Sequence, residues 1–159
     1  MRVGIGFDIH RLKEQEKLIL GGVEIQYKMG LVGHSDADVL THALIDAILG
    51  ALGKGDIGQH FPDNEEIYRG INSLILLKEV YALMKKNNFK LNNADLILIA
   101  QKPKVSSYSE KIVRNFCDIL CVDSNRINFK ATTSENIGFI GREEGMAAKA
   151  IVSLIENEK

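Results

Sequence analysis

The stretch Gly6–His10, which reads GFDIH, places an aspartate and a histidine two residues apart. If this segment is a strand, Asp8 and His10 point to one face and Phe7 and Ile9 to the other, because side chains alternate along a strand. Carboxylates and imidazoles are both metal ligands, so the strand would hold two candidate ligands on a rigid support. Taken alone, the stretch is explained more simply as a solvated polar face.

The segment His34–Ala47, HSDADVLTHALIDA, offers a third candidate ligand. Capping and the helix dipole are the simplest explanation for Asp36 and Asp38, because both stand at the start of an expected helix. His42 has an aspartate four residues away on either side, Asp38 and Asp46, and either could orient its imidazole. With the pair in GFDIH, this histidine would complete two imidazoles and one carboxylate, a set that suits zinc with one position open. The spacing leaves open whether strand and helix meet in space.

Two further segments contain groups that bind phosphate. Gly53–Asp63 combines three glycines with polar residues, and small residues let backbone N–H groups approach a ligand, although a surface turn explains this segment equally well. Lys130–Gly145 contains adjacent threonines, a carboxylate at Glu135 and a guanidinium at Arg142, which are groups that bind a diphosphate with a divalent metal. Gln101–Lys104, QKPK, adds cations at the end of another expected strand.

The elements that must position these residues follow from hydrophobic periodicity. Strand patterns are found at Arg2–Arg11, Lys17–Leu20, Val23–Gln26, Ala94–Gln101 and Ile127–Thr132. Helix patterns are found at Asp38–Leu52, Leu74–Asn87, Ser107–Leu120 and Arg142–Glu156. Because strands and helices alternate along the chain, we predict an α/β (α+β) fold, with residues 1–159 as a single domain and helices packed on one face of one mixed β-sheet.

The composition excludes several classes of protein. The 159 residues carry a net charge of −1, which provides no basic surface for nucleic acid. No apolar run approaches the roughly 20 residues that a membrane helix needs. We therefore expect no nucleic-acid or membrane partner and a cytoplasmic location, or an organelle stroma if a transit peptide has been removed. Cys117 and Cys121 lie four apart on an expected helix, and we expect buried structural residues there rather than a metal or redox pair.

Five segments together, GFDIH, HSDADVLTHALIDA, GDIGQHFPD, IAQKPK and KATTSENIGFIGREEG, resemble the 2-C-methyl-D-erythritol 2,4-cyclodiphosphate synthase family of the non-mevalonate isoprenoid pathway. The resemblance covers essentially the whole chain and is to the stand-alone enzyme rather than to the form fused to a cytidylyltransferase. It implies a phosphorus–oxygen lyase. The implied reaction converts 4-diphosphocytidyl-2-C-methyl-D-erythritol 2-phosphate to the 2,4-cyclodiphosphate and CMP by metal-assisted intramolecular phosphoryl transfer.

The resemblance also implies the cofactors, the assembly and the site. It implies one zinc ion per subunit on Asp8, His10 and His42, and Mg²⁺ or Mn²⁺ held by Glu135 with the substrate diphosphate. It implies a homotrimer with active sites at the subunit interfaces, and transition-state stabilisation by His34 and Thr133. The implied substrate-binding residues are Asp8, Ile9, His10, His34, Ser35, Asp56, Ile57, Gly58, Phe61, Pro62, Asp63, Asn64, Glu65, Ala100, Gln101, Lys102, Pro103, Lys104, Val105, Ser106, Thr132, Thr133, Ser134, Glu135, Phe139 and Arg142.

Two departures from the family pattern are Ala37, where glycine is frequent, and the pair Val105 and Ser106, which replaces bulkier residues beside the cytidine. Two other functions stay open. One is a zinc phosphohydrolase that uses a bound water as nucleophile, which would release free phosphate or an open-chain diphosphate. The other is a non-catalytic, ligand-binding trimer, against which the complete set of metal-ligand types argues.

Overall fold

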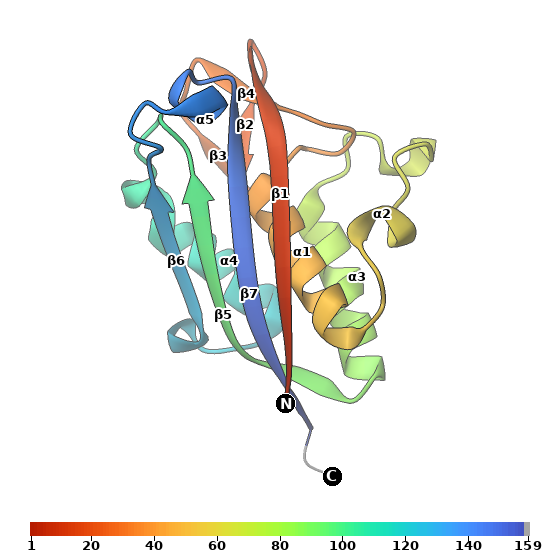
Figure 1. Cartoon of the computed structure of the whole chain (residues 1–159). Coiled ribbons are helices and arrows are strands. Elements are labelled where there is room, and N and C mark those ends of the chain that lie inside the picture. Colours follow the sequence, from red (N-terminus) through yellow and green to blue (C-terminus); the bar gives the residue numbers. More distant parts are fainter. Residues whose placement is uncertain (158–159) are drawn as a thin grey trace.

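Five strands form one mixed sheet in the order β4–β1–β7–β5–β6 (Figure 1). The computed structural model of the chain describes residues 1–157. The strands are β1 (Arg2–Glu14), β4 (Met29–Val32), β5 (Phe89–Ile99), β6 (Ile127–Thr132) and β7 (Gly145–Glu156). All neighbouring pairs are antiparallel except β5 and β6, which are parallel. The predicted mixed sheet is therefore confirmed.

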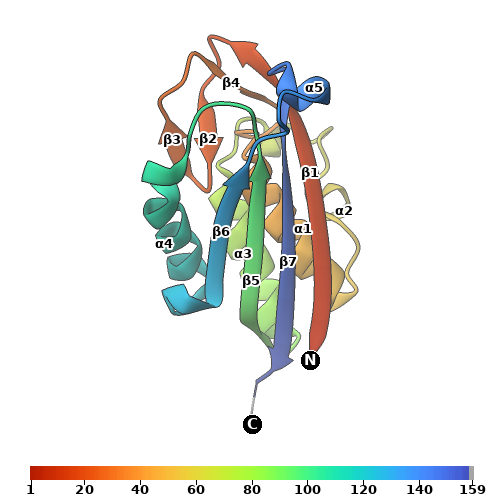
Figure 2. The same cartoon turned by 60° about the vertical axis from the view of Figure 1, so that its left-hand side comes forward.

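Three longer helices cover one face of this sheet, as the two views together show (Figures 1 and 2). They are α1 (Val39–Leu52), α3 (Ser73–Lys86) and α4 (Ser109–Leu120), and the prediction of helices on one face is confirmed. Shorter elements are the helices α2 (Ile57–His60) and α5 (Gly138–Gly141), the 3₁₀ turns Glu66–Tyr68, Ser106–Tyr108 and Ser124–Arg126, and the separate hairpin of β2 (Leu18–Leu20) and β3 (Val23–Ile25). Among residues 1–157, no helix combines the length and the apolar character that crossing a membrane requires.

Glycines in β1 let α1 lie unusually close to the strand. Gly4 and Gly6 are buried on the helix side of β1. A Cβ atom added at Gly6 would lie 2.7 Å from the backbone nitrogen of Ala47 and nearer still to the carbonyl oxygen of Ala43. Real Cβ atoms essentially never come within 3.0 Å of another heavy atom in this way. This close approach matters for the site, because the next side chain on the same face of β1 belongs to Asp8.

The N-terminus of α1 is fixed by a buried carboxylate. Asp38 is fully buried and accepts hydrogen bonds from the backbone N–H and the hydroxyl of Thr41, as an N-cap does. It also accepts from the N–H groups of Gly21 and Gly22, which form the turn between β2 and β3 with φ values of 56° and 69°. Glycine is the residue that adopts such left-handed turn positions without steric cost. One side chain therefore joins the hairpin to the start of α1, and the capping explanation of Asp38 is confirmed.

The predicted helix Arg142–Glu156 is wrong, because Gly145–Glu156 is the central strand β7. The alanines of this segment favour a helix by propensity. In the structure, Ala148, Ala150, Val152 and Leu154 are all fully buried, which is the period-two pattern of a strand with one covered face. β7 pairs with β1 on one side and β5 on the other, so tertiary pairing overrides the local preference. β4 was not predicted, because four residues are too few to show a periodicity.

Within residues 1–157, no layer of helices covers the other face of the sheet (Figure 1). Val3, Ile5 and Phe7 on β1 are 62%, 66% and 51% exposed, and Ile151, which pairs with Ile5 across the sheet, is 50% exposed. Contiguous exposed apolar side chains on a folded domain are typical of a protein–protein contact surface.

Candidate metal centre and neighbouring cavities

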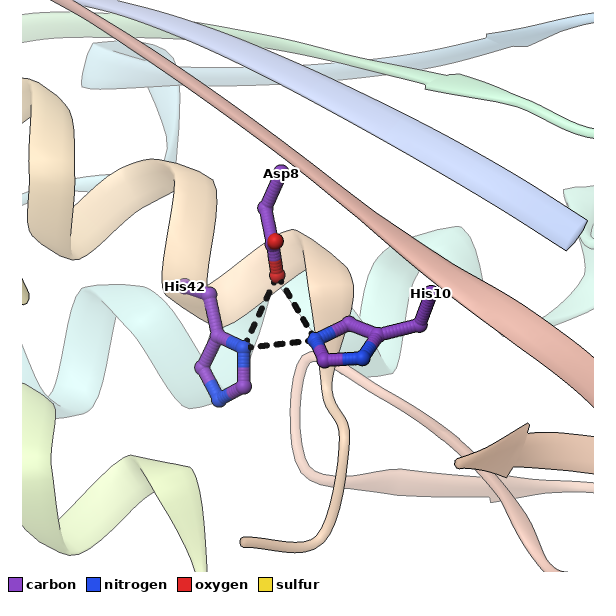
Figure 3. A group of neighbouring side chains, drawn as sticks. All are labelled: Asp8, His10 and His42. Carbon is purple, nitrogen blue, oxygen red and sulfur yellow. Dashed lines mark hydrogen bonds and ion pairs between the residues drawn. The ribbon is translucent and has the colours of Figure 1, made fainter. Parts of the chain in front are cut away.

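Asp8, His10 and His42 converge between β1 and α1 (Figure 3). The Oδ2 atom of Asp8 lies 2.9 Å from Nε2 of His10 and 2.9 Å from Nδ1 of His42. The two imidazole nitrogens are 3.2 Å apart. Within residues 1–157, this is the one group of three histidine, cysteine or acidic residues whose ligand atoms lie close enough together to hold a metal ion. The structure thus brings together the three side chains that the sequence singled out.

The chemistry of this donor set fits a cation. The Nδ1 atom of His10 lies 2.9 Å from the carbonyl oxygen of Val32 in β4. A carbonyl oxygen only accepts, so Nδ1 carries the proton and a neutral His10 turns the lone pair of Nε2 toward Asp8. The lone pair of His10 Nε2 and those of the Asp8 carboxylate then point at the same position. A cation at that position would relieve their mutual repulsion. A tetrahedral zinc ion with bonds of about 2.0–2.2 Å would place its ligand atoms roughly 3.3–3.5 Å apart. The observed separations of 2.9, 2.9 and 3.2 Å are shorter, so the three side chains would move apart slightly to admit the ion.

The electrostatics of the metal-free chain agree with this arrangement. Burial raises the pKa of Asp8, but hydrogen bonds from His10 and His42 and their charges outweigh it and hold the pKa well below its usual range. Burial lowers the pKa of His10, while the hydrogen bond and charge of Asp8 raise it, and the net shift is upward. The site therefore stabilises a negative carboxylate facing a positive partner, which is the charge pattern a metal ion would complete.

Hydroxyl groups, rather than the aspartates four residues away, contact the outer nitrogen of His42. Its Nε2 atom lies 2.9 Å from Oγ of Ser73 and 3.0 Å from Oγ of Ser35. Asp46, one of the two expected partners, instead accepts a hydrogen bond from the backbone of Ile57 at 2.7 Å. The expectation that Asp38 or Asp46 orients His42 is therefore wrong. Ser73 comes from a helix 31 residues further along the chain, and its spacing carried no signal in the sequence.

A cavity of about 330 Å³ opens beside the triad. Its lining residues are Asp8, His10, His34, Ser35, His42, Ile57, Gly58, Phe61, Asp63, Tyr68 and Leu76. The resemblance implies a metal or substrate role for nine of these residues but not for Tyr68 and Leu76. Asp56, expected at the same place, caps α2 through hydrogen bonds from Gln59, while Pro62, Asn64 and Glu65 belong to the following loop and do not line the cavity.

A second cavity of about 430 Å³ lies at the carboxyl ends of β5 and β6. It is lined by Leu98, Ala100, Gln101, Pro103, Lys104, Val105, Ser106, Ser109, Lys130, Ala131, Thr132 and Thr133. The expected residue Lys102 points elsewhere, since its Nζ is 2.9 Å from a carboxylate oxygen of Glu143. Glu143 also accepts a hydrogen bond of 2.7 Å from the hydroxyl of Tyr27. The two cavities share no lining residue, so the single chain keeps the two groups of expected site residues apart.

The remaining expected residues follow β6. The hydroxyl of Thr133 donates to Glu135 Oε1 at 2.6 Å, on an exposed turn, and that of Ser134 donates to the carbonyl oxygen of Ile137. Phe139 lines a third cavity, of about 820 Å³, with Ile9 and His10. Arg142 forms a two-pronged ion pair with Glu144. Ala37, two residues after Ser35, has φ of 55°, a left-handed conformation that glycine adopts without steric cost and alanine only with strain.

The chain is similar over its whole length to proteins of known family. A family model described as the YgbB family matches residues 1–155. The 2-C-methyl-D-erythritol 2,4-cyclodiphosphate synthase of Halothermothrix orenii is 63% identical over 159 residues, which cover 100% of this chain and 96% of that protein.

Two solved structures share the fold. The bifunctional IspDF of Campylobacter jejuni matches with a TM-score of 0.95 and 45% identity over 99% of this chain. The chain spans 42% of that longer protein. A CDP complex of IspF from Plasmodium falciparum matches with a TM-score of 0.87 and 38% identity, covering 99% of this chain and 97% of the other.

Proposed function

The chain belongs to the YgbB family, and on this premise we propose that it converts 4-diphosphocytidyl-2-C-methyl-D-erythritol 2-phosphate to 2-C-methyl-D-erythritol 2,4-cyclodiphosphate and CMP. The reaction makes it an enzyme of isoprenoid precursor synthesis, in the class of phosphorus–oxygen lyases. The observation that carries the proposal is the convergence of Asp8, His10 and His42 on one point, beside a cavity that can take a small polar substrate.

In this reaction the substrate brings its own nucleophile. The 2-phosphate attacks the β-phosphorus of the diphosphate, the bond from that phosphorus to the bridging oxygen breaks, and CMP leaves with the electron pair. A phosphate is already an anion, so the protein has to hold the two ends together and neutralise charge rather than remove a proton. The chain offers no serine or cysteine nucleophile at the cavity beside the triad, apart from Ser35, whose hydroxyl is held against His42.

Asp8, His10 and His42 would hold zinc, one ion per subunit, and Glu135 would hold Mg²⁺ or Mn²⁺ together with the diphosphate. Bound at these positions, the two ions would polarise the phosphoryl oxygens and neutralise charge on the leaving group. His34 lines the cavity beside the triad, where it can donate a hydrogen bond to a phosphoryl oxygen. Thr133, on the second cavity, can use its hydroxyl in the same way once it turns from Glu135.

The second cavity is assigned to the cytidine diphosphate half of the substrate. Its walls combine apolar side chains with the ammonium group of Lys104 and with hydroxyl groups of Thr132 and Ser106. Such a lining suits a planar base with phosphates attached, because apolar walls bind the ring and polar groups bind the phosphates. The CDP complex named above is a relative with the same fold, and it supports this assignment.

We assign the enzyme to a homotrimer with its active sites between subunits. Two features of the single chain support this assembly. The sheet face that carries Val3, Ile5, Phe7 and Ile151 is apolar and uncovered. The two cavities that must hold the two ends of one substrate share no lining residue. A closed ring with heterologous interfaces would place the metal cavity of one subunit against the cytidine cavity of its neighbour.

Turnover of the purified chain tests the reaction. The protein is incubated with the diphosphocytidyl substrate, Zn²⁺ and Mg²⁺, and the products are separated and identified. We expect the cyclic diphosphate and CMP in equal amounts, and no reaction after treatment with a strong chelator until metal is restored. Free phosphate or an open-chain diphosphate as the product would identify a phosphohydrolase and overturn the proposal.

Mixing two inactive variants tests the shared site. One variant is His42→Ala, and the other carries Lys104→Ala with Thr133→Ala. If subunits exchange freely and each site draws one half from each neighbour, equal mixing should restore about one quarter of the sites, since only one of the four pairings joins two intact halves. No recovered activity in subunits shown to exchange, or full activity of a monomer by sedimentation, would contradict the shared-site assembly.

A further inference from the structure

Ser73 is a buried polar residue that the proposed reaction does not use. It is the first residue of α3, its side chain is fully buried, and its Oγ lies 2.9 Å from Nε2 of His42. The same hydroxyl donates to Oδ1 of Asp36, and the backbone N–H of Ser73 donates to Oδ2 of Asp36 at 3.0 Å. Both oxygens of one carboxylate are therefore engaged by a single serine. We propose that Ser73 and Asp36 are positioning residues for the metal centre, which hold His42 with Nε2 protonated and Nδ1 free to bind the metal.

The direction of the hydrogen bonds carries this inference. An ionised carboxylate only accepts, so the hydroxyl proton of Ser73 points to Asp36. Only lone pairs of Oγ then remain for His42, and its Nε2 must supply the proton of that contact. The lone pair of the neutral imidazole consequently lies on Nδ1, the nitrogen 2.9 Å from Asp8. A serine without the carboxylate behind it could donate or accept, and it would leave the tautomer undecided.

Each histidine of the triad thus has its own acceptor on the side away from the metal position. The carbonyl oxygen of Val32 holds the Nδ1 proton of His10, and the Ser73–Asp36 pair holds the Nε2 proton of His42. Such outer contacts orient metal-bound imidazoles and raise their basicity, and their loss typically costs about 10–100-fold in metal affinity or activity. The inference goes beyond the catalytic and binding residues assigned above, and it rests on the proposed metal centre.

Ser35 provides an internal comparison, because its hydroxyl lies at nearly the same distance from the same nitrogen, 3.0 Å. Among the described hydrogen bonds, its Oγ otherwise only accepts from the backbone N–H of Ala37 at 3.3 Å. No carboxylate fixes the direction of its proton, so the Ser35 hydroxyl can either donate to Nε2 of His42 or accept from it. The pair Ser73 and Asp36 is also held more firmly, since the backbone N–H of Asp36 donates to the carbonyl oxygen of Ile71 at 3.0 Å. We therefore expect Ser73 to matter more than Ser35 for metal binding.

Substitution of Asp36 by asparagine should reverse the direction of the hydrogen bonds that run from His42 through Ser73 to residue 36. One position of the new side chain must present an NH₂ group where a carboxylate oxygen was. At the Oδ2 position this group would meet the backbone N–H of Ser73 at 3.0 Å, and at the Oδ1 position it would meet the more distant backbone N–H of Asp38 at 3.3 Å. The Oδ1 position is therefore favoured, and there the NH₂ group can donate to the Ser73 hydroxyl. The hydroxyl then donates to Nε2 of His42, and the imidazole proton moves to Nδ1, the metal-binding nitrogen. Asp36→Asn should weaken metal binding although it keeps the size of the side chain.

The experiment measures Zn²⁺ affinity at one fixed pH by competition with a chelator of known affinity. The variants are Ser73→Ala, Asp36→Asn and Ser35→Ala, each compared with the wild-type chain. Thr41→Val is the control for lost stability. Thr41 lies beside His42 on α1, and its fully buried hydroxyl donates a hydrogen bond to Asp38 rather than to His42. We expect roughly 10–100-fold weaker binding for Ser73→Ala and Asp36→Asn, a smaller loss for Ser35→Ala, and wild-type affinity for Thr41→Val.

A second measurement reads the tautomer directly in the metal-free protein, in a background that carries Asp8→Ala and His10→Ala, because both residues face Nδ1 of His42 and without a metal would draw the imidazole proton to it. Ring ¹⁵N labels on histidine distinguish a protonated Nε2 from a protonated Nδ1 by their chemical shifts. In this background we expect His42 to be protonated at Nε2 when Asp36 is present and at Nδ1 in Asp36→Asn, a change that a purely structural role would not produce. If Ser73→Ala does not fold, Asp36→Asn carries the test alone.

The outcomes separate this inference from the proposed function. Wild-type affinity for Zn²⁺ in both Ser73→Ala and Asp36→Asn, or an unchanged His42 tautomer in Asp36→Asn, would overturn the inference and leave the metal centre standing. A loss in Thr41→Val as large as in Ser73→Ala would also overturn it, because stability alone would then explain the effect. A wild-type chain that binds no Zn²⁺ would overturn the metal centre itself and the inference with it.

Discussion

Replacement of Gly6 by alanine should separate the two elements that carry the metal ligands. A Cβ atom at this position would lie 2.7 Å from the backbone nitrogen of Ala47, whereas ordinary van der Waals contact begins at 3.4 Å. The difference requires β1 and α1 to move apart by at least 0.7 Å, and the still closer contact with Ala43 O makes this a lower bound. The obstructing atoms belong to the backbone, so no side chain can turn away to relieve the clash.

Both stability and metal binding should respond. Overpacking of a filled core costs about 1–3 kcal/mol, and a clash with helix backbone should fall in the upper half of that range. For a chain of this size the corresponding drop in melting temperature is roughly 4–12 °C. Metal–ligand distances tolerate only about 0.2 Å of error, so a shift of 0.7 Å between Asp8 on β1 and His42 on α1 should also weaken zinc binding.

Gly50→Ala is the matched control. Gly50 lies on α1, the helix that Gly6 packs against, and it is exposed. A Cβ atom added there would meet only the carbonyl oxygen of Ile5, at 3.8 Å. Alanine in a helix is favoured over glycine by about 0.5–1 kcal/mol, so this variant should melt slightly higher and bind zinc normally. Thermal melts by circular dichroism at equal protein concentration and zinc titrations measure both effects. If Gly6→Ala melts and binds zinc like the wild type, the close approach of α1 to β1 does not hold the site together.

Four further predictions concern His42, the two cysteines and Tyr27. His42→Ala should retain the fold and lose zinc by at least the 10–100-fold that changes in outer contacts cost, and elemental analysis that finds full zinc occupancy would reject it as a ligand. Cys121 is exposed with φ of 53°, whereas Cys117 is buried and burial raises the pKa of its thiol, so a thiol reagent should modify Cys121 in the native protein and Cys117 only after unfolding. Replacing both cysteines with alanine should leave the zinc content unchanged, and loss of zinc would show that a thiol contributes to the site. Burial and the hydrogen bond to Glu143 raise the pKa of Tyr27 from 10.0 to about 12, so its contribution to stability is present below pH 10 and is lost as the pH rises toward 12. Phenolate absorbance should show Tyr27 ionising at lower pH in Glu143→Gln, and an unchanged titration curve would show that the carboxylate does not control it.

Local patterns in the sequence determined most of the elements and the types of ligand. Alternation along β1 puts Asp8 and His10 on one face, and the apolar periodicity of α1 is visible without any partner. These patterns are local, because the direction of the side chains repeats every two residues in a strand and every 3.6 residues in a helix. The expectation that both cysteines are buried was half right. Cys117 packs into the core, but α4 ends at Leu120 and Cys121 is its exposed C-cap.

Only the tertiary structure decided how the elements meet and what surrounds the ligands. β7 is a strand because it pairs on both sides, although its alanines favour a helix. Val32 and Ser73, which contact the outer nitrogens of the two histidines, are separated from their partners by 22 and 31 residues. No periodicity connects residues so far apart along the chain. Their contact depends on the register of β4 against β1 and on the docking of α3, and both are set by the packing of the whole domain.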